Sequence, residues 1–367
     1  MARRETGLVP TTNTTMWRTE AITTATIAGY GRHLLDVASA TPEHLLATID
    51  VALPHLDLRV RVPEGTLADA VRTAFVPWGD KASKPSRRAE ITVLDPTVGD
   101  TPDPLGWGSA PYVPHEISRS LSQVGLQGSL FHDLRFWQFH DLATGQGVQL
   151  MAGPDSFPPW EPGAPLRAFL HWEYAAQGRR MTHAGTLGRE GRGVLLAGAG
   201  GSGKSGTVLA GLLHGLSSVG DDYVLVDLSE NRVCAFPIFT TLKQDERGAR
   251  RLHLDRLLGS RELNWQGKVQ FRTSDIEADI ARDGLSIGAI LLPKVGADAT
   301  SVHVASRSEA MLGLAPSAVY QMPGERESGF RFFSRLVSML PAYRLELGPD
   351  PEEIAAVLWQ FMDELAS

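Results

Sequence analysis

The segment from Gly198 to Ser205 reads Gly-Ala-Gly-Gly-Ser-Gly-Lys-Ser and fits the pattern G-x-x-x-x-G-K-[ST]. The apolar run Gly193–Ala197 before it predicts a short buried strand, and Thr207–Leu216 after it predicts a helix. A strand, a glycine-rich turn and a helix in this order are the context that a phosphate-binding loop requires. The segment therefore favours an α/β fold, with a glycine-rich turn that binds nothing as the alternative.

A phosphate-binding loop gives each residue type a chemical role. Glycines let the backbone curl so that successive N–H groups point at phosphate oxygens, and the helix N-terminus adds its positive end. Lys204 is expected to contact the β- and γ-phosphates, and the Ser205 hydroxyl to bind Mg²⁺. The predicted nucleotide-binding residues are Gly198, Ala199, Gly200, Gly201, Ser202, Gly203, Lys204, Ser205 and Gly206. The expected cofactors are ATP and Mg²⁺.

Two adjacent carboxylates, Asp221 and Asp222, follow the predicted helix and precede the apolar stretch Tyr223–Leu228. Only one short helix separates them from the loop, so we expect them near the phosphate site. Adjacent aspartates repel each other, and the pair makes sense where a cation and a transferable proton share one site. One carboxylate can hold Mg²⁺ while the other accepts a proton from an attacking hydroxyl. A solvated Asp-Asp turn is the alternative.

The order of His183, the strand, the loop and Val219-Gly-Asp-Asp222 resembles the catalytic domain of HPr kinase/phosphorylase, and still more the shorter bacterial HPr-kinase-like proteins. The resemblance extends from about Trp160 to the C-terminus and includes Pro165–Trp172, Ala289–Lys294 and Leu314–Ser317. Phosphoenolpyruvate carboxykinases share the loop and a Gly-Asp-Asp motif but are much longer chains.

The resemblance implies roles for particular residues. Lys204 and Ser205 match the family's nucleotide and magnesium positions, Asp222 matches the proposed base, and Asp221 matches its helper, assigned here to the metal. His183 matches a histidine near the phosphates on the strand before the loop, although a lone histidine is more often a packed one. Genuine HPr kinases usually carry Glu where Gly206 stands. This departure argues against HPr as the substrate and against the reverse phosphorylase reaction.

Two further cations are candidates to neutralise phosphate or to hold the acceptor. Lys294 follows a predicted strand, Ile287–Pro293, and Arg307 precedes the helical pattern of Ser308–Leu314. A surface position is the alternative for both residues. Earlier in this region, Thr240–Lys243 is predicted to open a basic helical segment that continues through Arg256.

Composition excludes several classes of protein. The net charge of −7 argues against general nucleic-acid binding, because the phosphate backbone would be repelled. Cys234 is the single cysteine, so no disulfide can form within the chain, and a reducing cytoplasm is the expected compartment. No apolar stretch approaches the length of a membrane span, and the N-terminus lacks the apolar core of a signal peptide. The expected partners include no nucleic acid and no membrane, and a homo-oligomer is compatible with the sequence.

The chain is long enough for two or three domains. We predict a loose tail over 1–16, an α+β domain over 17–152 that helps to recognise the substrate, and an HPr-kinase-like catalytic domain over 153–367. In the smaller domain, strands are expected at Leu56–Val62, at Glu90–Leu94 and on both sides of the turn Asp141–Gly145. Two groups of side chains could have either a structural or a binding role: the basic cluster Lys81, Lys84, Arg87 and Arg88, and the aromatic residues Phe131, Phe136, Trp137, Phe139, Trp160 and Trp172.

Taken together, the sequence predicts a P-loop kinase, a phosphotransferase with an alcohol group as acceptor. The expected reaction transfers the γ-phosphoryl of ATP to a hydroxyl, foremost that of serine in a peptide or protein. One alternative is a kinase of a small hydroxylated metabolite. Another is a regulatory module that binds a nucleotide without transferring phosphate, and such a module would need a metal ligand but no base.

Overall fold

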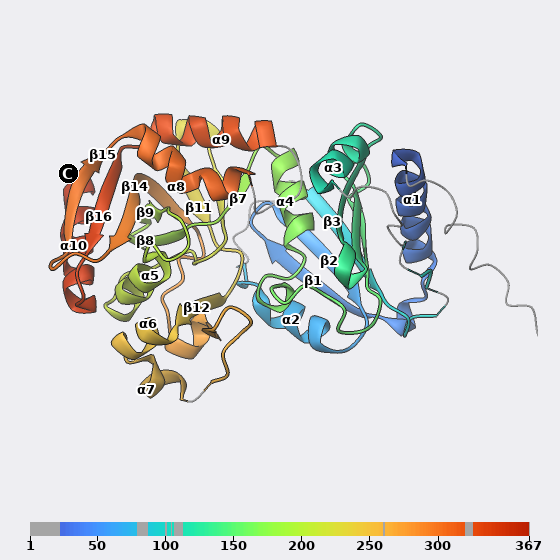
Figure 1. The fold of residues 1–367 in the computed structure, drawn as a ribbon, viewed down its shortest axis with the longest axis horizontal. Helices are drawn as coiled ribbons and strands as arrows, with labels where there is room; N and C mark the ends of the chain where they lie inside the picture. The colour runs from blue at the N-terminus through green and yellow to red at the C-terminus, as the bar shows by residue number, and fades with distance from the viewer. Residues whose placement is uncertain are drawn as a thin grey trace, which may run out of the picture.

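The computed structural model describes residues 23–78, 87–99, 101–103, 105, 113–259, 261–319 and 326–366. It is a mixed α/β structure with two main sheets and a small two-stranded one (Figure 1). The predicted tail over 1–16 and the residues Lys81 and Lys84 lie outside the described residues. Among the described residues, no helix combines the length and the apolar character needed to cross a membrane.

The first sheet has six strands in the order β1-β2-β3-β6-β5-β4, with β3 parallel to β2 and to β6 and the other pairs antiparallel. The elements of this part, the N-terminal unit, are α1 (Thr24–Ala40), η1 (Glu43–Leu45), β1 (Ala47–Leu53), β2 (Leu56–Val62), α2 (Thr66–Ala74), β3 (Arg87–Leu94), α3 (Pro114–Ser122), β4 (Leu126–Phe131), η2 (His132–Leu134), β5 (Phe136–Asp141) and β6 (Gln146–Leu150). Side chains of α1 and α3 share one core cluster with this sheet, and those of α2 share another. Apolar residues therefore point to both faces, as a sheet covered on both sides requires.

The second sheet has eight strands, arranged around the long strand β14, which pairs in parallel with β9 and with β16. Its elements, the C-terminal unit, are β7 (Arg180–Thr182), β8 (Gly185–Arg189), β9 (Arg192–Leu196), α5 (Lys204–Leu213), β10 (Val224–Asp227), η4 (Ser229–Asn231), β11 (Cys234–Phe236), η5 (Thr273–Ile276), β14 (Leu285–Val295), β15 (Ser301–Ala305), α8 (Arg307–Val319), α9 (Arg326–Met339), β16 (Ala342–Leu347) and α10 (Pro351–Ala366). Helices α5 and α10 contact each other and belong to the core on one face, while side chains of α8 and α9 form the core on the other.

A two-stranded ribbon projects from the second sheet beside α5 (Figure 1). It consists of β12 (Thr241–Asp245) and β13 (Lys268–Arg272), and the helices α6 (Glu246–Arg251) and α7 (Leu254–Leu258) follow β12. The prediction of one helical segment over Thr240–Arg256 is therefore wrong at its start. All five residues of β12 pair with β13, and the Asp245 side chain then caps α6 by accepting a hydrogen bond from the Gly248 N–H at 2.8 Å.

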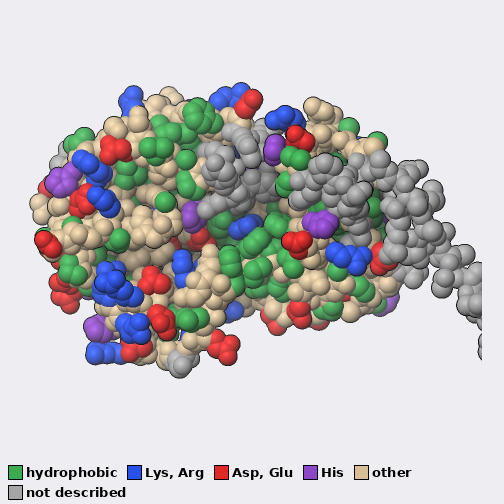
Figure 2. Space-filling view, in the orientation of Figure 1, with side chains coloured by type: hydrophobic (Ala, Val, Ile, Leu, Met, Phe, Trp, Pro, Cys, Tyr) green, Lys and Arg blue, Asp and Glu red, His purple; other side chains and the backbone are tan. Residues whose placement is uncertain are grey.

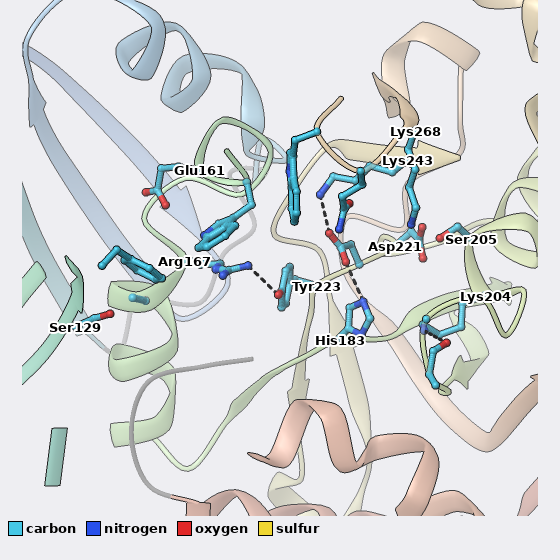
Figure 3. A pocket seen from close by; sticks show the side chains of 18 of the residues that line it. Ser129, Glu161, Arg167, His183, Lys204, Ser205, Asp221, Tyr223, Lys243 and Lys268 are labelled. Atoms are coloured by element: carbon cyan, nitrogen blue, oxygen red, sulfur yellow. Dashed lines mark hydrogen bonds and ion pairs between the residues drawn. The ribbon is translucent and has the colours of Figure 1, made fainter. Parts of the chain in front are cut away.

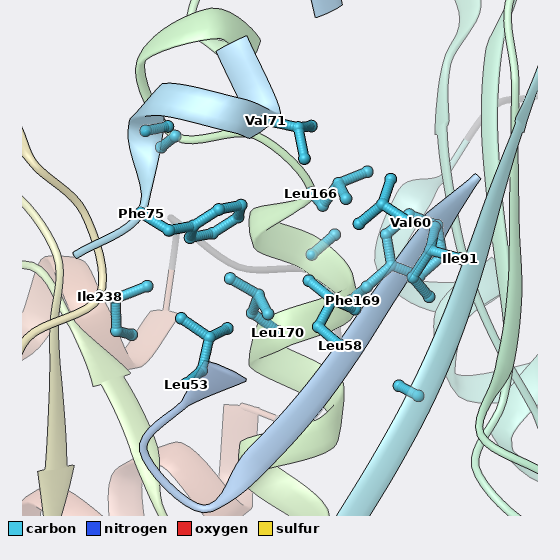
Figure 4. Close-up of a cluster of buried hydrophobic side chains, with 14 of the residues drawn as sticks. Leu53, Leu58, Val60, Val71, Phe75, Ile91, Leu166, Phe169, Leu170 and Ile238 are labelled. Carbon is cyan, nitrogen blue, oxygen red and sulfur yellow. The ribbon is translucent and has the colours of Figure 1, made fainter. Parts of the chain in front are cut away.

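The helix α4 (Arg167–Ala176), preceded by η3 (Glu161–Gly163), joins the two units. Its residues Phe169 and Leu170 lie in one hydrophobic core with Val60 of the first sheet and Ile238 of the second unit (Figure 4). A polar contact adds to this core, because the fully buried Glu173 of α4 accepts from His140 Nε2 of β5 at 2.6 Å and also pairs with Arg87. The two units therefore share one continuous core.

The basic cluster and the aromatic residues divide between core and surface. Arg87 pairs with buried Glu173, whereas Arg88 is exposed and lies 3.6 Å from Asp57. The rings of Trp137 and Phe139 stack at 5.2 Å beneath α1, in the core. Phe136 and Trp172 are also buried. The two other aromatic residues of the set, Phe131 and Trp160, line a cavity.

Candidate active site

A cavity of about 1430 Å³ lies between the two units. Its lining combines the glycine-rich loop, Asp221–Tyr223 and the ribbon β12–β13 with residues of α3, β4 and η2 from the N-terminal unit. On the face of the molecule in Figure 2, hydrophobic side chains gather beside basic, acidic and histidine side chains where the two halves meet. We name the part around the loop the nucleotide end and the part towards β4 the acceptor end, after the roles expected from the sequence.

The glycine-rich loop connects β9 to α5, in the strand, turn and helix order predicted from the sequence. The helix begins at Lys204, three residues before the predicted start at Thr207. Gly203, just before it, has φ of 105°. A Cβ atom at Gly203 would lie 2.5 Å from Leu347, so both the backbone angle and the space require glycine here.

Lys204 is only 6% exposed and lies against the loop itself. Its Nζ donates hydrogen bonds to the carbonyl oxygen of Gly198 at 2.6 Å and to that of Ala199 at 3.3 Å. Burial lowers the pKa of Lys204, while the nearby charges of Asp221 and Asp222 act in the opposite direction. The ammonium group is thus held at the mouth of the loop.

Asp221 is 3% exposed and accepts a hydrogen bond from the Ser205 hydroxyl. Its Oδ1 atom is buried and has no hydrogen-bond partner among the described residues. Burial raises the pKa of this carboxyl; the Ser205 hydrogen bond opposes the rise and the charge of Asp222 adds to it. An unsatisfied buried oxygen beside a serine hydroxyl is a suitable partner for a cation.

A magnesium ion fits this pair of residues. In the described part of the chain, no group of three or more His, Cys, Asp and Glu side chains is arranged to hold a metal. Magnesium at phosphate sites, however, commonly binds through one or two protein oxygens together with phosphate oxygens and water. The Ser205 hydroxyl and Asp221 Oδ1 supply donors of this kind.

Asp222 is held by a histidine and a lysine (Figure 3). His183 Nε2 lies 3.0 Å from its Oδ1 atom, and Lys243 Nζ donates to its Oδ2 atom at 2.9 Å. Burial alone would raise the pKa of Asp222, but the His183 hydrogen bond and the Lys243 charge outweigh it and hold that pKa well below its usual range. The residue has φ of 73°, which is uncommon for a residue other than glycine and aims its side chain into the cavity.

His183 lies in the cavity, but not on the strand that immediately precedes the loop. It follows β7, and the strands β8 and β9 stand between it and Gly198. The Ser317 hydroxyl of α8 accepts a hydrogen bond from the His183 backbone N–H at 2.9 Å. The histidine thus reaches Asp222 because β7 and β10 are paired, a contact that the sequence order alone does not indicate.

Three basic residues at the nucleotide end were not among the predicted site residues: Lys243, Arg251 and Lys268. The charge of Lys268 lies close enough to Lys204 to lower its pKa. A Cβ atom at Gly206 would lie 3.3 Å from Arg251 Nη2 and 3.2 Å from Gln244 Nε2. The space beside Gly206 is therefore occupied by donors of hydrogen bonds.

Lys294 and Arg307 are not brought to the cavity. Lys294 Nζ is 3.7 Å from Glu346 Oε1 on the neighbouring strand, and the lysine side chain is 71% exposed. Its neighbour Val295 lines the cavity, because successive side chains of a strand point to opposite faces. Arg307 is exposed, and its Nη2 donates to the Ser338 carbonyl oxygen at 3.4 Å. The structure offers neither residue a contact with the loop.

The acceptor end is lined by aromatic side chains around Arg167. The Trp160 ring lies 5.3 Å from the ring of Phe131 and 5.9 Å from that of Trp265, centroid to centroid. Arg167 donates to the Tyr223 hydroxyl at 3.0 Å. Tyr223 directly follows Asp222, so this aromatic wall begins next to the acidic pair.

No protein-family model matches the chain, and no curated protein is significantly similar to it.

Proposed function

We propose that the chain is an ATP- and Mg²⁺-dependent kinase of the HPr-kinase type, which transfers the γ-phosphoryl group to a hydroxyl. One observation carries the proposal: Lys204, the Ser205–Asp221 pair and Asp222 converge on one end of a cavity that continues past Asp222 to a second wall. A module that only binds a nucleotide needs Lys204, Ser205 and Asp221. Such a module does not need the ionised carboxylate of Asp222, which faces the part of the cavity beyond the nucleotide end.

The nucleotide end supplies charge stabilisation. Lys204 neutralises the β- and γ-phosphates once its ammonium exchanges the loop carbonyl oxygens for phosphate oxygens. Lys268 and Arg251 add positive charge at the same end. Magnesium, when bound, screens the phosphate charge and orients the leaving group, and Ser205 and Asp221 would hold it.

Asp222 serves as the proton acceptor. The acceptor oxygen forms a bond to the γ-phosphorus, the bond to the oxygen bridging to ADP breaks, and the hydroxyl proton passes to a carboxylate oxygen of Asp222. The low pKa keeps Asp222 ionised before the reaction. If the Lys243 ammonium turns towards the phosphates when ATP binds, Asp222 loses a cationic partner and its affinity for the proton increases.

The acceptor hydroxyl is proposed to be that of serine in a peptide or protein, with a small hydroxylated metabolite as the alternative. The cavity extends to residues of the N-terminal unit, which supports a role of that unit in positioning the acceptor. Gly206, which stands where genuine HPr kinases usually carry Glu, supports a kinase that works in one direction and does not act on HPr.

Mass spectrometry tests the proposal. The full chain is incubated with ATP, Mg²⁺ and candidate serine peptides or metabolites, and parallel samples contain EDTA. A gain of one phosphoryl group that EDTA abolishes supports the kinase. Efficient phosphorolysis of phospho-HPr contradicts the single direction, and nucleotide binding without any phosphorylated acceptor favours the regulatory module.

A further inference from the structure

Arg167 presents a fixed guanidinium group in the cavity wall beside Tyr223 (Figure 3). It is the first residue of α4, and its guanidinium carbon lies 5.0 Å from the centre of the Trp160 ring and 5.5 Å from that of Tyr223. Its Nη1 atom also donates to the Tyr223 hydroxyl at 3.0 Å. Two rings and a hydrogen bond thus hold the plane of the guanidinium in place.

Among the described residues, no carboxylate lies within ion-pair distance of the Arg167 guanidinium. Burial raises the pKa of Glu161 to about 7 and outweighs the charge of Arg167, which acts to lower that pKa. The Glu161 Oε1 atom accepts its hydrogen bond from the Leu166 N–H, at 2.8 Å. A guanidinium carries five N–H donors, and Tyr223 takes one. The half-buried group therefore retains donors for a ligand.

The position of Arg167 relative to Asp222 indicates which ligand this would be. Its hydrogen-bond partner Tyr223 is the residue after Asp222, and the glycine-rich loop lies at the nucleotide end with Lys204 and Lys268. Arg167 instead lies against the rings of Trp160 and Tyr223, and Trp160 in turn contacts Phe131 at the acceptor end. A group bound by Arg167 would thus belong to the acceptor and not to the nucleotide.

The geometry points to an acceptor that carries a carboxylate close to its reactive hydroxyl, with Arg167 binding the carboxylate while the hydroxyl faces Asp222. This inference rests on the proposed function, because it concerns the acceptor of that reaction. The planar, forked guanidinium matches a carboxylate better than it matches any neutral group. Sources of such a carboxylate include a free hydroxy acid and an acidic side chain next to a serine in a peptide.

Matched pairs of probes test the inference and separate these sources. L-serine and L-serinamide form the small-molecule pair, and acetyl-Ser-Asp-amide and acetyl-Ser-Asn-amide form the peptide pair. Binding of each is measured by calorimetry on the full chain with Mg²⁺ and a non-hydrolysable ATP analogue. The proteins are the parental chain, Arg167→Gln, Arg167→Lys and the surface control Arg59→Gln, whose Arg59 pairs with Asp50 away from the cavity.

We expect the parental chain to bind the carboxylate member of at least one pair about ten- to a hundredfold more tightly than the amide, the range for a hydrogen bond to a charged group. Arg167→Gln should remove this preference by weakening the carboxylate member alone, and Arg167→Lys should retain part of it, because the charge stays while the fork is lost. Arg59→Gln should keep the whole preference. Circular dichroism establishes that each variant is folded.

The inference is overturned if the parental chain shows no preference for the carboxylate member, which includes the case in which neither member binds. It is also overturned if a folded Arg167→Gln variant keeps the preference. Phosphoryl transfer is measured on the same probes. A carboxylate preference in binding without any transfer contradicts the proposed kinase and leaves the Arg167 subsite standing. Equal transfer to both members of each pair supports the kinase and overturns the subsite.

Discussion

The two ends of the cavity are built in different ways. The nucleotide end consists mainly of consecutive residues, the loop 198–206 and the pair Asp221–Asp222, on one strand-loop-helix unit and the turn that follows. The acceptor end gathers Phe131, Trp160 and Trp265 from separate parts of the chain. Backbone conformation thus determines the loop and the acidic pair of the first end, whereas tertiary packing determines the second end and brings Lys243 and Lys268 to the first. The acceptor end can consequently change by substitution of a few side chains while the loop and the acidic pair stay intact.

Asp222→Asn should have the largest effect, and it should separate phosphoryl transfer from ATP binding at the nucleotide end. We expect transfer to fall by roughly 10²–10⁴-fold, the contribution of a general base, while ATP binding is retained. Quantitative mass spectrometry of the phosphorylated acceptor and calorimetry with ATP measure the two quantities. Transfer at the parental rate would show that the proton acceptor is another group.

Lys204→Ala should act on the nucleotide end alone. Loss of a charged hydrogen-bond donor to phosphate should weaken ATP binding by about ten- to a hundredfold, while leaving the fold intact. Binding of the carboxylate probes in the absence of nucleotide should be unchanged. Calorimetry measures both affinities, and ATP binding at the parental affinity would remove the phosphate-loop assignment.

Asp221→Asn should increase the Mg²⁺ concentration required for transfer by about tenfold, because an amide oxygen replaces a charged ligand.

The pH dependence of stability follows from the raised pKa of Asp221. The folded chain binds this proton more tightly than the unfolded chain, so stability decreases as the pH rises from the ordinary pKa of 3.8 through the raised value.

Magnesium should offset this loss, because the ion stabilises the ionised carboxylate. We expect Mg²⁺ to raise the Tm of the parental chain more at neutral pH than near pH 4, and to raise that of Asp221→Asn little at either pH. Thermal unfolding followed by circular dichroism measures the shifts. An equal magnesium effect in both proteins would place the ion elsewhere.

Trp265→Ala should have the smallest effect, restricted to the acceptor end. Trp265 is 54% exposed, so its contact with Trp160 resembles the peripheral contacts of an interface, most of which contribute little. We expect the KM for the acceptor to rise about two- to fivefold with an unchanged KM for ATP. Steady-state kinetics with both substrates distinguishes this result from a change at the nucleotide end.

Local patterns predicted the parts of the fold that local interactions determine. The strand before the loop, the helix after it and the hairpin β5–β6 around Asp141–Gly145 are all present. The acidic pair lies beside the loop, as its position directly before an apolar stretch suggested. The strand β1, the first of its hairpin, was not predicted, because its side chains alternate between half-buried and exposed. Its strand conformation depends on pairing with β2.

The parts that depend on distant contacts could not be derived from spacing. Lys243 was placed on a helix, whereas pairing with β13 makes its segment a strand and directs the ammonium group to Asp222. Arg167 was not among the predicted site residues, because only the folded chain places Tyr223 and Trp160 beside it. Lys294 was predicted to follow a strand, but it lies within β14, and the alternation along that strand turns its side chain away from the cavity.

The shared core at α4 has a consequence for how the chain is synthesised. The last strand of the first sheet ends at Leu150, whereas the helix whose Phe169 and Leu170 cover that sheet begins at Arg167. Because the polypeptide leaves the ribosome from its N-terminus, a nearly complete sheet emerges with part of one apolar face still bare. Ile238, which completes the same core, emerges later still. Residues up to Leu150 therefore cannot reach their final stability until α4 and then the segment around Ile238 have been synthesised.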